Sequence, residues 1–140
     1  GLDPEMQVNG KPCPLFVPLV EEGFAKHHIA EEVIDYYLND MKNSGIDTMI
    51  LGCTHYPLIR STLGRIIGEG VTLVNPAYET ARELKELLER EQLLNEKKQE
   101  LGMNCYRFYV SDMAEKFQSF ANSILKYGIL SARKIDIEHY

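Results

Sequence analysis

The sequence predicts an α/β fold in three layers, with a mainly parallel sheet flanked by helices. Short apolar runs of strand length alternate with longer stretches in which apolar residues recur every three or four positions. Glycine, asparagine and proline separate these stretches, as expected for the turns between them. Strands that alternate with helices pair in parallel and are joined by right-handed crossovers.

The beginning of the chain carries little periodic signal. Residues 1–10 contain turn formers, and we expect them to be a disordered or expression-derived end. Residues 11–140 are expected to form a single domain, because 140 residues with 44% hydrophobic content can bury one core. Three prolines within Lys11–Gly23 predict an extended, irregular segment that ends at Glu21 and Glu22.

The next stretch reads as helix, strand and helix. Apolar residues recur at helical spacing from Ile29 to Met41, and the turn formers Asn43–Gly45 end this helix. Ile46–Leu51 is predicted to be a buried strand, and Leu58–Ile67 to be a second helix. This order predicts one strand–helix unit of the sheet.

A second unit follows. Val71–Val74 is predicted to be a short strand, and Ala77–Leu94 a long helix with leucines on one face and charges on the other. Glu89–Leu101 either continues this helix after a break or forms a solvated excursion.

The last part of the chain predicts a third unit. Tyr106–Val110 alternates as a strand does, and Ser111–Glu115 is typical of a capped helix start ahead of further apolar residues. Lys134–Ile137 is predicted to close the domain as a final short strand.

Composition excludes several classes of function. A net charge of −6 and a pI near 5.2 argue against a nucleic-acid partner, since phosphate binding needs clustered basic residues. No apolar run reaches the length of a membrane span, so a protein without membrane association is expected. The three cysteines, Cys13, Cys53 and Cys105, include no C-x-x-C pair and favour a reducing, cytoplasmic location.

The segment Leu51–Pro57 is the strongest candidate site, because it places Cys53, Thr54 and His55 between a strand and a helix. Ligands of open α/β sheets bind beyond the carboxyl ends of strands, where helix N–H groups attract anions and stabilise a thiolate. The residues alone leave a proton-transfer group, a nucleophile, a metal ligand and a buried structural cysteine open. No second Cys/His pair completes a recognisable metal set, so we expect no metal.

Four segments carry a resemblance to a known family. Gly52–Pro57, preceded by Asp47–Leu51, resembles the second cysteine motif of glutamate racemases. Cys13–Gly23 resembles a loop of that family, and Leu73–Ala77 and Phe108–Phe117 are similar to its later segments. The resemblance implies one half of a two-domain racemase fold and the cofactor-independent interconversion of L- and D-glutamate, which supplies peptidoglycan synthesis.

The resemblance also implies roles for individual residues. Cys53 is one of two thiols that face opposite sides of the substrate α-carbon, and His55 assists its proton exchange. Thr54 helps to hold the substrate carboxylate. Glu21 orients the substrate ammonium or the imidazole, with Glu22 as the alternative if the register differs by one. Cys13 and Cys105 match no catalytic position.

The family's first half, with its own catalytic cysteine, is not matched by any segment. The chain therefore resembles a C-terminal half, and we expect it to be inactive alone. Residues 106–140 are expected to pack on the first half, or to bury their apolar residues by self-association. Two rivals stay open: an aspartate racemase of the same superfamily, and a non-catalytic binding or interaction domain with this fold.

Overall fold

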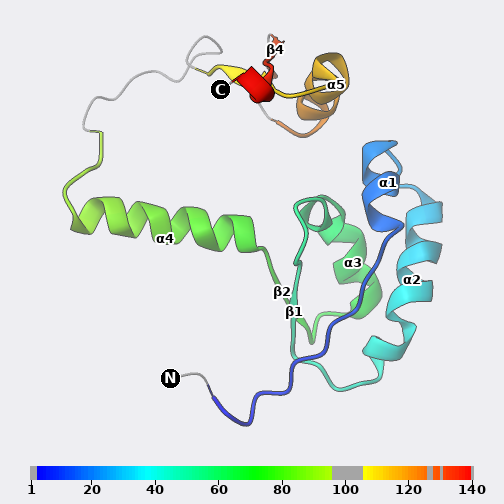
Figure 1. Cartoon of the computed structure of the whole chain (residues 1–140). Helices are drawn as coiled ribbons and strands as arrows, with labels where there is room; N and C mark the ends of the chain where they lie inside the picture. Colours follow the sequence, from blue (N-terminus) through cyan, green and yellow to red (C-terminus); the bar gives the residue numbers. More distant parts are fainter. Residues whose placement is uncertain (1–2, 96–105, 126–127, 130, 140) are drawn as a thin grey trace. The chain divides into compact units, whose positions relative to one another are not determined.

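The computed structural model describes residues 3–95, 106–125, 128–129 and 131–139 (Figure 1). The chain divides into two compact units, Gly1–Leu87 and Leu88–Tyr140. The single domain expected over residues 11–140 stays a prediction.

The first unit contains a pair of parallel strands. β1 (Thr48–Ile50) pairs with β2 (Thr72–Val74), with Thr48 opposite Thr72 and Ile50 opposite Val74. The strands are connected through the 3₁₀ helix η1 (Tyr56–Ile59) and helix α3 (Arg60–Ile67). Strand, helix and parallel strand therefore follow one another as predicted, and the α/β fold class is confirmed.

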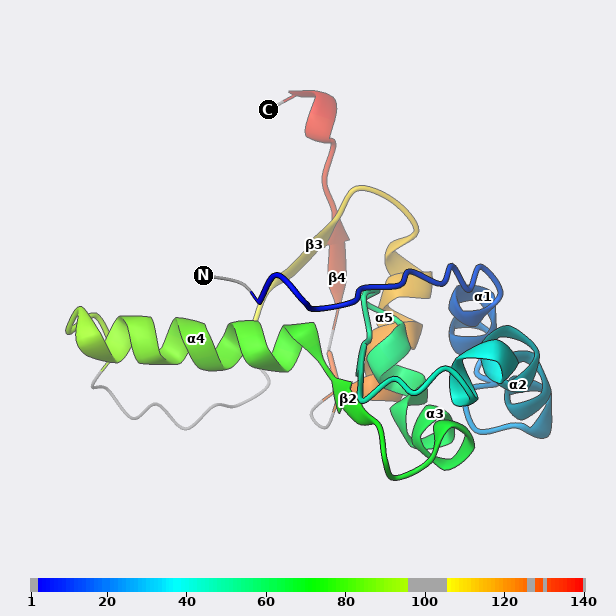
Figure 2. The same cartoon turned by 90° about the horizontal axis from the view of Figure 1, so that it is seen from below.

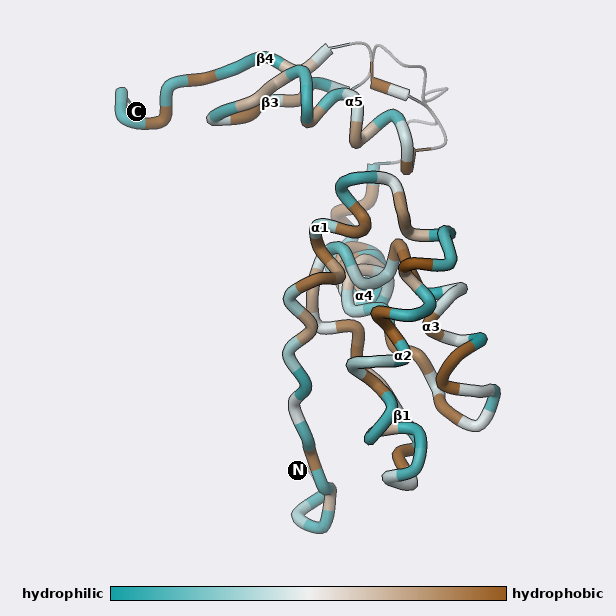
Figure 3. The backbone as a smooth tube through the Cα atoms, turned by 90° about the vertical axis from the view of Figure 1, so that its right-hand side faces the viewer, coloured by the Kyte–Doolittle hydropathy of each residue, from teal (hydrophilic) through white to brown (hydrophobic). Residues whose placement is uncertain are grey.

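Helix α2 (His28–Lys42) confirms the helix predicted over Ile29–Met41. Its buried residues, Ala30, Ile34 and Leu38, lie at i, i+4 and i+8, which places them on one side of a helix. α2 packs against α3, and the tube changes between hydrophobic and hydrophilic colours every few residues in this unit (Figure 3). The apolar faces of these helices form the core together with Phe16, Leu51, Ile59 and Leu63.

The extended conformation predicted for Lys11–Gly23 is wrong after Leu15, because helix α1 occupies Phe16–Glu21. Pro18 lies in the first turn of this helix. The N–H groups of a first turn have no intrahelical acceptor, so a proline there removes no hydrogen bond. Phe16 and Val20 are buried, and this burial favours the helix over an irregular segment.

The buried strand predicted over Ile46–Leu51 is shorter and only partly buried. Ile50 is 66% exposed, whereas Leu51 is 2% exposed. Within the first unit, α1, α2 and α3 lie to one side of the two strands (Figures 1 and 2). Since a strand points successive side chains to opposite faces, only one of these two neighbours reaches the core.

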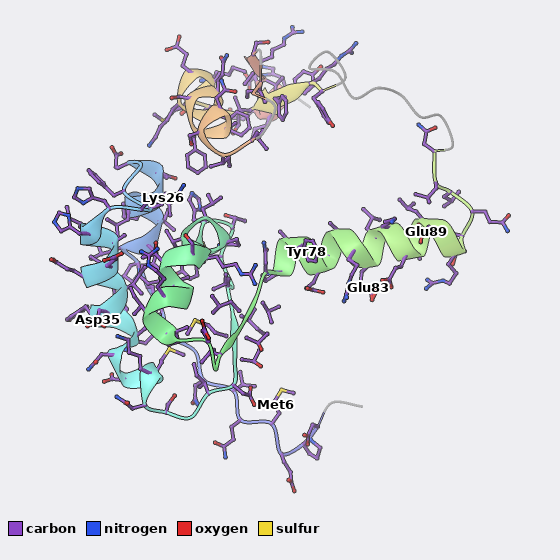
Figure 4. The ribbon with its side chains drawn as sticks, turned by 180° about the vertical axis from the view of Figure 1, so that it is seen from behind. Met6, Lys26, Asp35, Tyr78, Glu83 and Glu89 are labelled. Carbon is purple, nitrogen blue, oxygen red and sulfur yellow. The ribbon has the colours of Figure 1, made fainter. Side chains whose placement is uncertain are left out.

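Helix α4 (Pro76–Arg90) begins one residue before the predicted Ala77 and ends before the predicted Leu94. Asn75 caps its start, because the Asn75 side-chain oxygen accepts the N–H of Ala77 at 3.1 Å. None of the described side chains of α4 is buried, and Tyr78, Glu83 and Glu89 project from it (Figure 4). The continuation predicted toward Leu101 falls from residue 96 outside the described residues.

The second unit contains its own pair of parallel strands. β3 (Phe108–Val110) pairs with β4 (Ala132–Lys134), and α5 (Ala114–Ile124) lies between them in the chain. A strand within the predicted Tyr106–Val110 is confirmed, but it begins only at Phe108. The last strand, β4, begins two residues before the predicted Lys134–Ile137 and ends at Lys134, and residues 137–139 form the 3₁₀ helix η3 (Ile137–His139).

The capping signal predicted at Ser111–Glu115 is wrong in its detail. The residue before α5 is Met113, which has a φ of 46° and makes no side-chain cap hydrogen bond. Asp112, the better capping residue, instead accepts a hydrogen bond from Lys134 at 2.8 Å. That bond lowers the pKa of the Asp112 carboxyl below its usual value. The Asp112 carboxylate thus accepts from Lys134 at the end of β4 and from the Met113 N–H, while the α5 N-cap residue itself makes no side-chain cap.

The opposite exposure of Leu51 and Ile50 leads to a stability prediction. Leu51→Ala should lower the free energy of unfolding by about 2–5 kcal/mol, because it opens a cavity in the core. Ile50→Ala, the matched control one residue away, should cost less than about 1 kcal/mol. Urea denaturation of the two variants measures both values, and equal costs would contradict the described orientation of β1.

Candidate active site

Cys53, Thr54 and His55 lie in the loop that leaves the carboxyl end of β1, as the sequence predicted. The Leu51 N–H still bonds the Val74 carbonyl of the sheet, at 3.0 Å. The Cys53 N–H then folds back on the Leu51 carbonyl at 2.9 Å, and the Tyr56 N–H bonds the Cys53 carbonyl at 3.3 Å. The loop is thus held by backbone bonds on both sides of Cys53.

The imidazole of His55 brings two distant segments together. Its Nε2 atom lies 3.3 Å from Oε1 of Glu21, the last residue of α1. Its Nδ1 atom lies 3.2 Å from the hydroxyl oxygen of Thr54. The His55 and Glu21 side chains are 22% and 36% exposed, so both are partly shielded from water. A carboxylate at one ring nitrogen and a hydroxyl at the other orient the imidazole.

Three of the four predicted site residues therefore form one polar chain, Glu21–His55–Thr54, and Cys53 lies two positions before His55. Cys53 is a half-buried free thiol. Of the two candidate carboxylates, Glu21 makes the contact with His55, while Glu22 is the exposed residue that caps the end of α1. The geometry thus favours Glu21 over Glu22.

Cys13 has a different environment. Its side chain is buried, and its thiol donates a weak hydrogen bond to the Lys11 carbonyl at 3.6 Å. Burial raises the pKa of the Cys13 thiol, and nearby Lys11 only partly opposes this effect. A thiol that stays protonated in an apolar setting behaves as a small hydrophobic side chain. Cys105 lies outside the described residues.

Sequence reasoning missed the part that Tyr56 plays in this region. The Tyr56 hydroxyl donates a hydrogen bond to the Cys13 carbonyl at 3.2 Å. Its ring packs roughly perpendicular to that of Phe16, with ring centroids 5.3 Å apart, and the rings of Phe16 and Tyr37 pack in the same way at 5.5 Å. Burial raises the pKa of Tyr56, so its hydroxyl keeps its proton at neutral pH. A tyrosine directly after the site histidine was the only signal in the sequence.

Among the described residues, no group of three or more His, Cys, Asp or Glu side chains could hold a metal ion. None of the helices in the described ranges is long and apolar enough to cross a bilayer. An open groove along α3 and β2, lined by Arg60, Arg65 and Leu73 among others, does not include Cys53.

Sequence comparison finds similar proteins along the whole chain, although no family model matches it. Glutamate racemase 2 of Caldanaerobacter subterraneus is 40% identical over 140 residues, which are 100% of this chain and 52% of the relative. Glutamate racemase of Neisseria meningitidis serogroup B is 41% identical over 123 residues, which are 88% of this chain and 44% of the relative. The chain spans about half the length of the curated relatives it matches.

Solved structures of glutamate racemases are also similar to this chain. Glutamate racemase of Francisella tularensis, in complex with D-glutamate, has a TM-score of 0.83 at 36% identity and is matched over 99% of this chain and 50% of its own. The RacE1 isoform from Bacillus anthracis has a TM-score of 0.85 at 30% identity, over 96% of this chain and 49% of its own.

The fold and the similarities define the class of protein: the chain is an α/β segment homologous to amino-acid racemases. Every relative named above is a glutamate racemase, and this chain is a homologue of about half of that protein. The resemblance that its motifs indicated is confirmed, and the match is consistent with a C-terminal half.

The contrast between the two described cysteines predicts their alkylation. Iodoacetamide at about pH 8 should modify Cys53 well before Cys13, because the raised pKa and burial of Cys13 leave little accessible thiolate. The rate at Cys13 should rise only as the pH passes above the ordinary thiol value. Peptide mapping by mass spectrometry separates the sites, and urea-unfolded chain is the control in which both react alike. Equal rates in the folded chain would contradict the assignment.

Proposed function

We propose that this chain supplies one of the two proton-transfer groups of a cofactor-independent glutamate racemase. The observation that carries the proposal is the Glu21–His55–Thr54 chain, in which His55 and Thr54 share one loop with the free thiol of Cys53. Similarity to glutamate racemases along the whole chain supports the substrate, as does the D-glutamate bound by the Francisella relative.

In the proposed reaction, a thiolate removes the α-proton of glutamate. The electron pair of the broken C–H bond stays on the α-carbon and is stabilised by the adjacent carboxylate and by the site. A thiol on the opposite face then donates its proton to the α-carbon, which gives the other enantiomer and a new thiolate. Each thiol acts as base in one direction and as acid in the other. Cys53 is one of these two groups.

The neighbouring residues have separate proposed roles. His55 exchanges a proton with Cys53, so that the thiol returns to its starting state after each turnover. Glu21 accepts from Nε2 of the imidazole and fixes its orientation, which leaves Nδ1 as the acceptor beside the Thr54 hydroxyl. Thr54, through its hydroxyl and backbone N–H, holds the substrate carboxylate close to Cys53.

A thiol on one face of the substrate cannot complete a racemisation. The second thiol belongs, in this proposal, to the half of the relatives that the chain does not match. We therefore propose that the chain acts with that half in the cytoplasm, where D-glutamate is made for peptidoglycan, and that no cofactor is needed.

Association with the other half is also proposed on the basis of exposed apolar residues. In the second unit, Tyr109, Phe117, Ile124 and Leu125 are each more than a third exposed. Apolar side chains gathered within so short a segment are typical of a surface that another polypeptide covers. The other half is the proposed occupant, and the self-association expected from the sequence is the alternative.

The proposed division of the site predicts the pattern of activity. The 140-residue chain alone should not racemise pure L-glutamate, whereas the chain joined to the complementary half should. In the joined protein, Cys53→Ser should lower the rate about 10²–10⁴-fold, the usual value of a proton-transfer group. Cys13→Ala is the matched control and should stay within about threefold of the unchanged protein. Circular dichroism follows the appearance of D-glutamate.

Two results would overturn parts of this proposal. Racemisation by the chain alone, abolished by Cys53→Ser, would show that the site is complete without the other half. Full activity of Cys53→Ser in the joined protein would remove Cys53 from the reaction. If the joined protein binds glutamate without converting it, the rival of a non-catalytic binding domain is supported instead.

A further inference from the structure

We propose that Tyr56 is a positioning residue, which keeps the Glu21 carboxylate against the imidazole of His55. The inference rests on the function proposed above, since it adds a residue to the same site. Tyr56 is not proposed to touch the substrate.

The first step is a hydrogen bond between distant segments. The Tyr56 hydroxyl donates to the carbonyl oxygen of Cys13, 43 positions earlier in the chain. The same oxygen accepts the backbone N–H of Phe16 at 3.1 Å. One carbonyl group therefore joins the site loop to the first residue of α1. Because Cys13 is buried, losing one of these bonds would leave the group less well satisfied.

The second step is packing at the same point. Phe16 is fully buried, and its ring packs roughly perpendicular to two tyrosine rings, those of Tyr37 on α2 and Tyr56 on η1. Perpendicular aromatic contacts of this kind add specific geometry to the burial of apolar area. The start of α1 is thus fixed against α2 and against η1.

Helix α1 connects Phe16 at its start to Glu21 at its end, next to His55. Glu21 lies five residues after Phe16, at about 7.5 Å along the helix axis. Its carboxylate meets His55, the residue directly before Tyr56. The contacts therefore form a closed ring: Tyr56 to Cys13, Cys13 to Phe16, α1 to Glu21, and Glu21 to His55.

This closed ring of contacts explains how the partly exposed contact between Glu21 and His55 keeps its geometry. An ion pair or hydrogen bond between side chains that are 22% and 36% exposed is weak on its own, since water competes for both groups. A fixed backbone at both ends reduces the number of arrangements that the two side chains can adopt. Removing the Tyr56 hydroxyl should break its bond to the Cys13 carbonyl while leaving the aromatic packing of residue 56 against Phe16 in place.

A double-mutant cycle on the 140-residue chain tests the proposal by NMR. The reporter is the Nε2 resonance of the His55 imidazole in ¹⁵N-labelled protein, measured at one fixed pH. In the unchanged background, Glu21→Gln should move this resonance, because it replaces the carboxylate beside the ring. In the Tyr56→Phe background, the same Glu21→Gln change should move it by about half as much or less.

Tyr37→Phe is the matched control, because Tyr37 also contacts Phe16 but no bond from its hydroxyl enters the ring of contacts. In that background the effect of Glu21→Gln should keep its full size. An equal effect of Glu21→Gln in the Tyr56→Phe and unchanged backgrounds would overturn the proposal. A reduction as large with Tyr37→Phe as with Tyr56→Phe would also overturn it.

A second variant keeps the test valid if Tyr56→Phe does not fold, as judged by amide peak dispersion. Phe16→Leu keeps apolar volume but removes the ring contact at the start of α1, and it should reduce the coupling in the same way. Full coupling in a folded Phe16→Leu variant would then overturn the proposal. The readout needs no turnover, so it stays distinct from failure of the proposed function, which appears as lost racemisation.

Discussion

The carbonyl oxygen of Cys13 is the point on which the candidate site depends. It accepts the hydroxyl of Tyr56 and the N–H of Phe16, and so joins a proline-rich loop, a short helix and the loop after β1. Helix α1 has only six residues and is too short to be stable by itself, so it depends on tertiary contacts such as this junction. Its docking places Glu21 beside His55. The site is therefore a product of tertiary packing between segments that lie more than 30 residues apart in the sequence.

The sequence predicted those features that depend on local patterns. The stripe of Ile34 and Leu38 identified α2, and glycine followed by Cys-Thr-His placed the site loop correctly at the end of β1. Helix α1 was missed because prolines argue for extended chain unless one falls in a first turn, which depends on where the helix begins. The capping signal over Ser111–Glu115 was wrong in its detail, because Asp112 bonds Lys134, 22 residues later. Long-range partners leave no trace in local periodicity, and the resemblance alone identified Glu21.

The division of the proposed chemistry follows from stereochemistry. In the proposed two-thiol reaction, one group removes the proton from one face of the α-carbon and another returns it to the opposite face, and a single loop approaches from one face. A chain that matches half of its relatives can thus hold a complete proton-transfer group without holding a complete site. The exposure of Ile50 and of the apolar residues in the second unit fits the proposed association with the other half.

Exchange of the glutamate α-hydrogen with deuterium from the solvent tests most directly whether the Cys53 thiol carries the proton. The chain joined to its complementary half would be placed in D₂O with each enantiomer separately, and deuterium at the α-carbon followed by NMR. We expect exchange from both enantiomers, and a loss of about 10²-fold or more for at least one of them with Cys53→Ser. Unchanged exchange from both enantiomers in the Cys53→Ser protein would contradict the account.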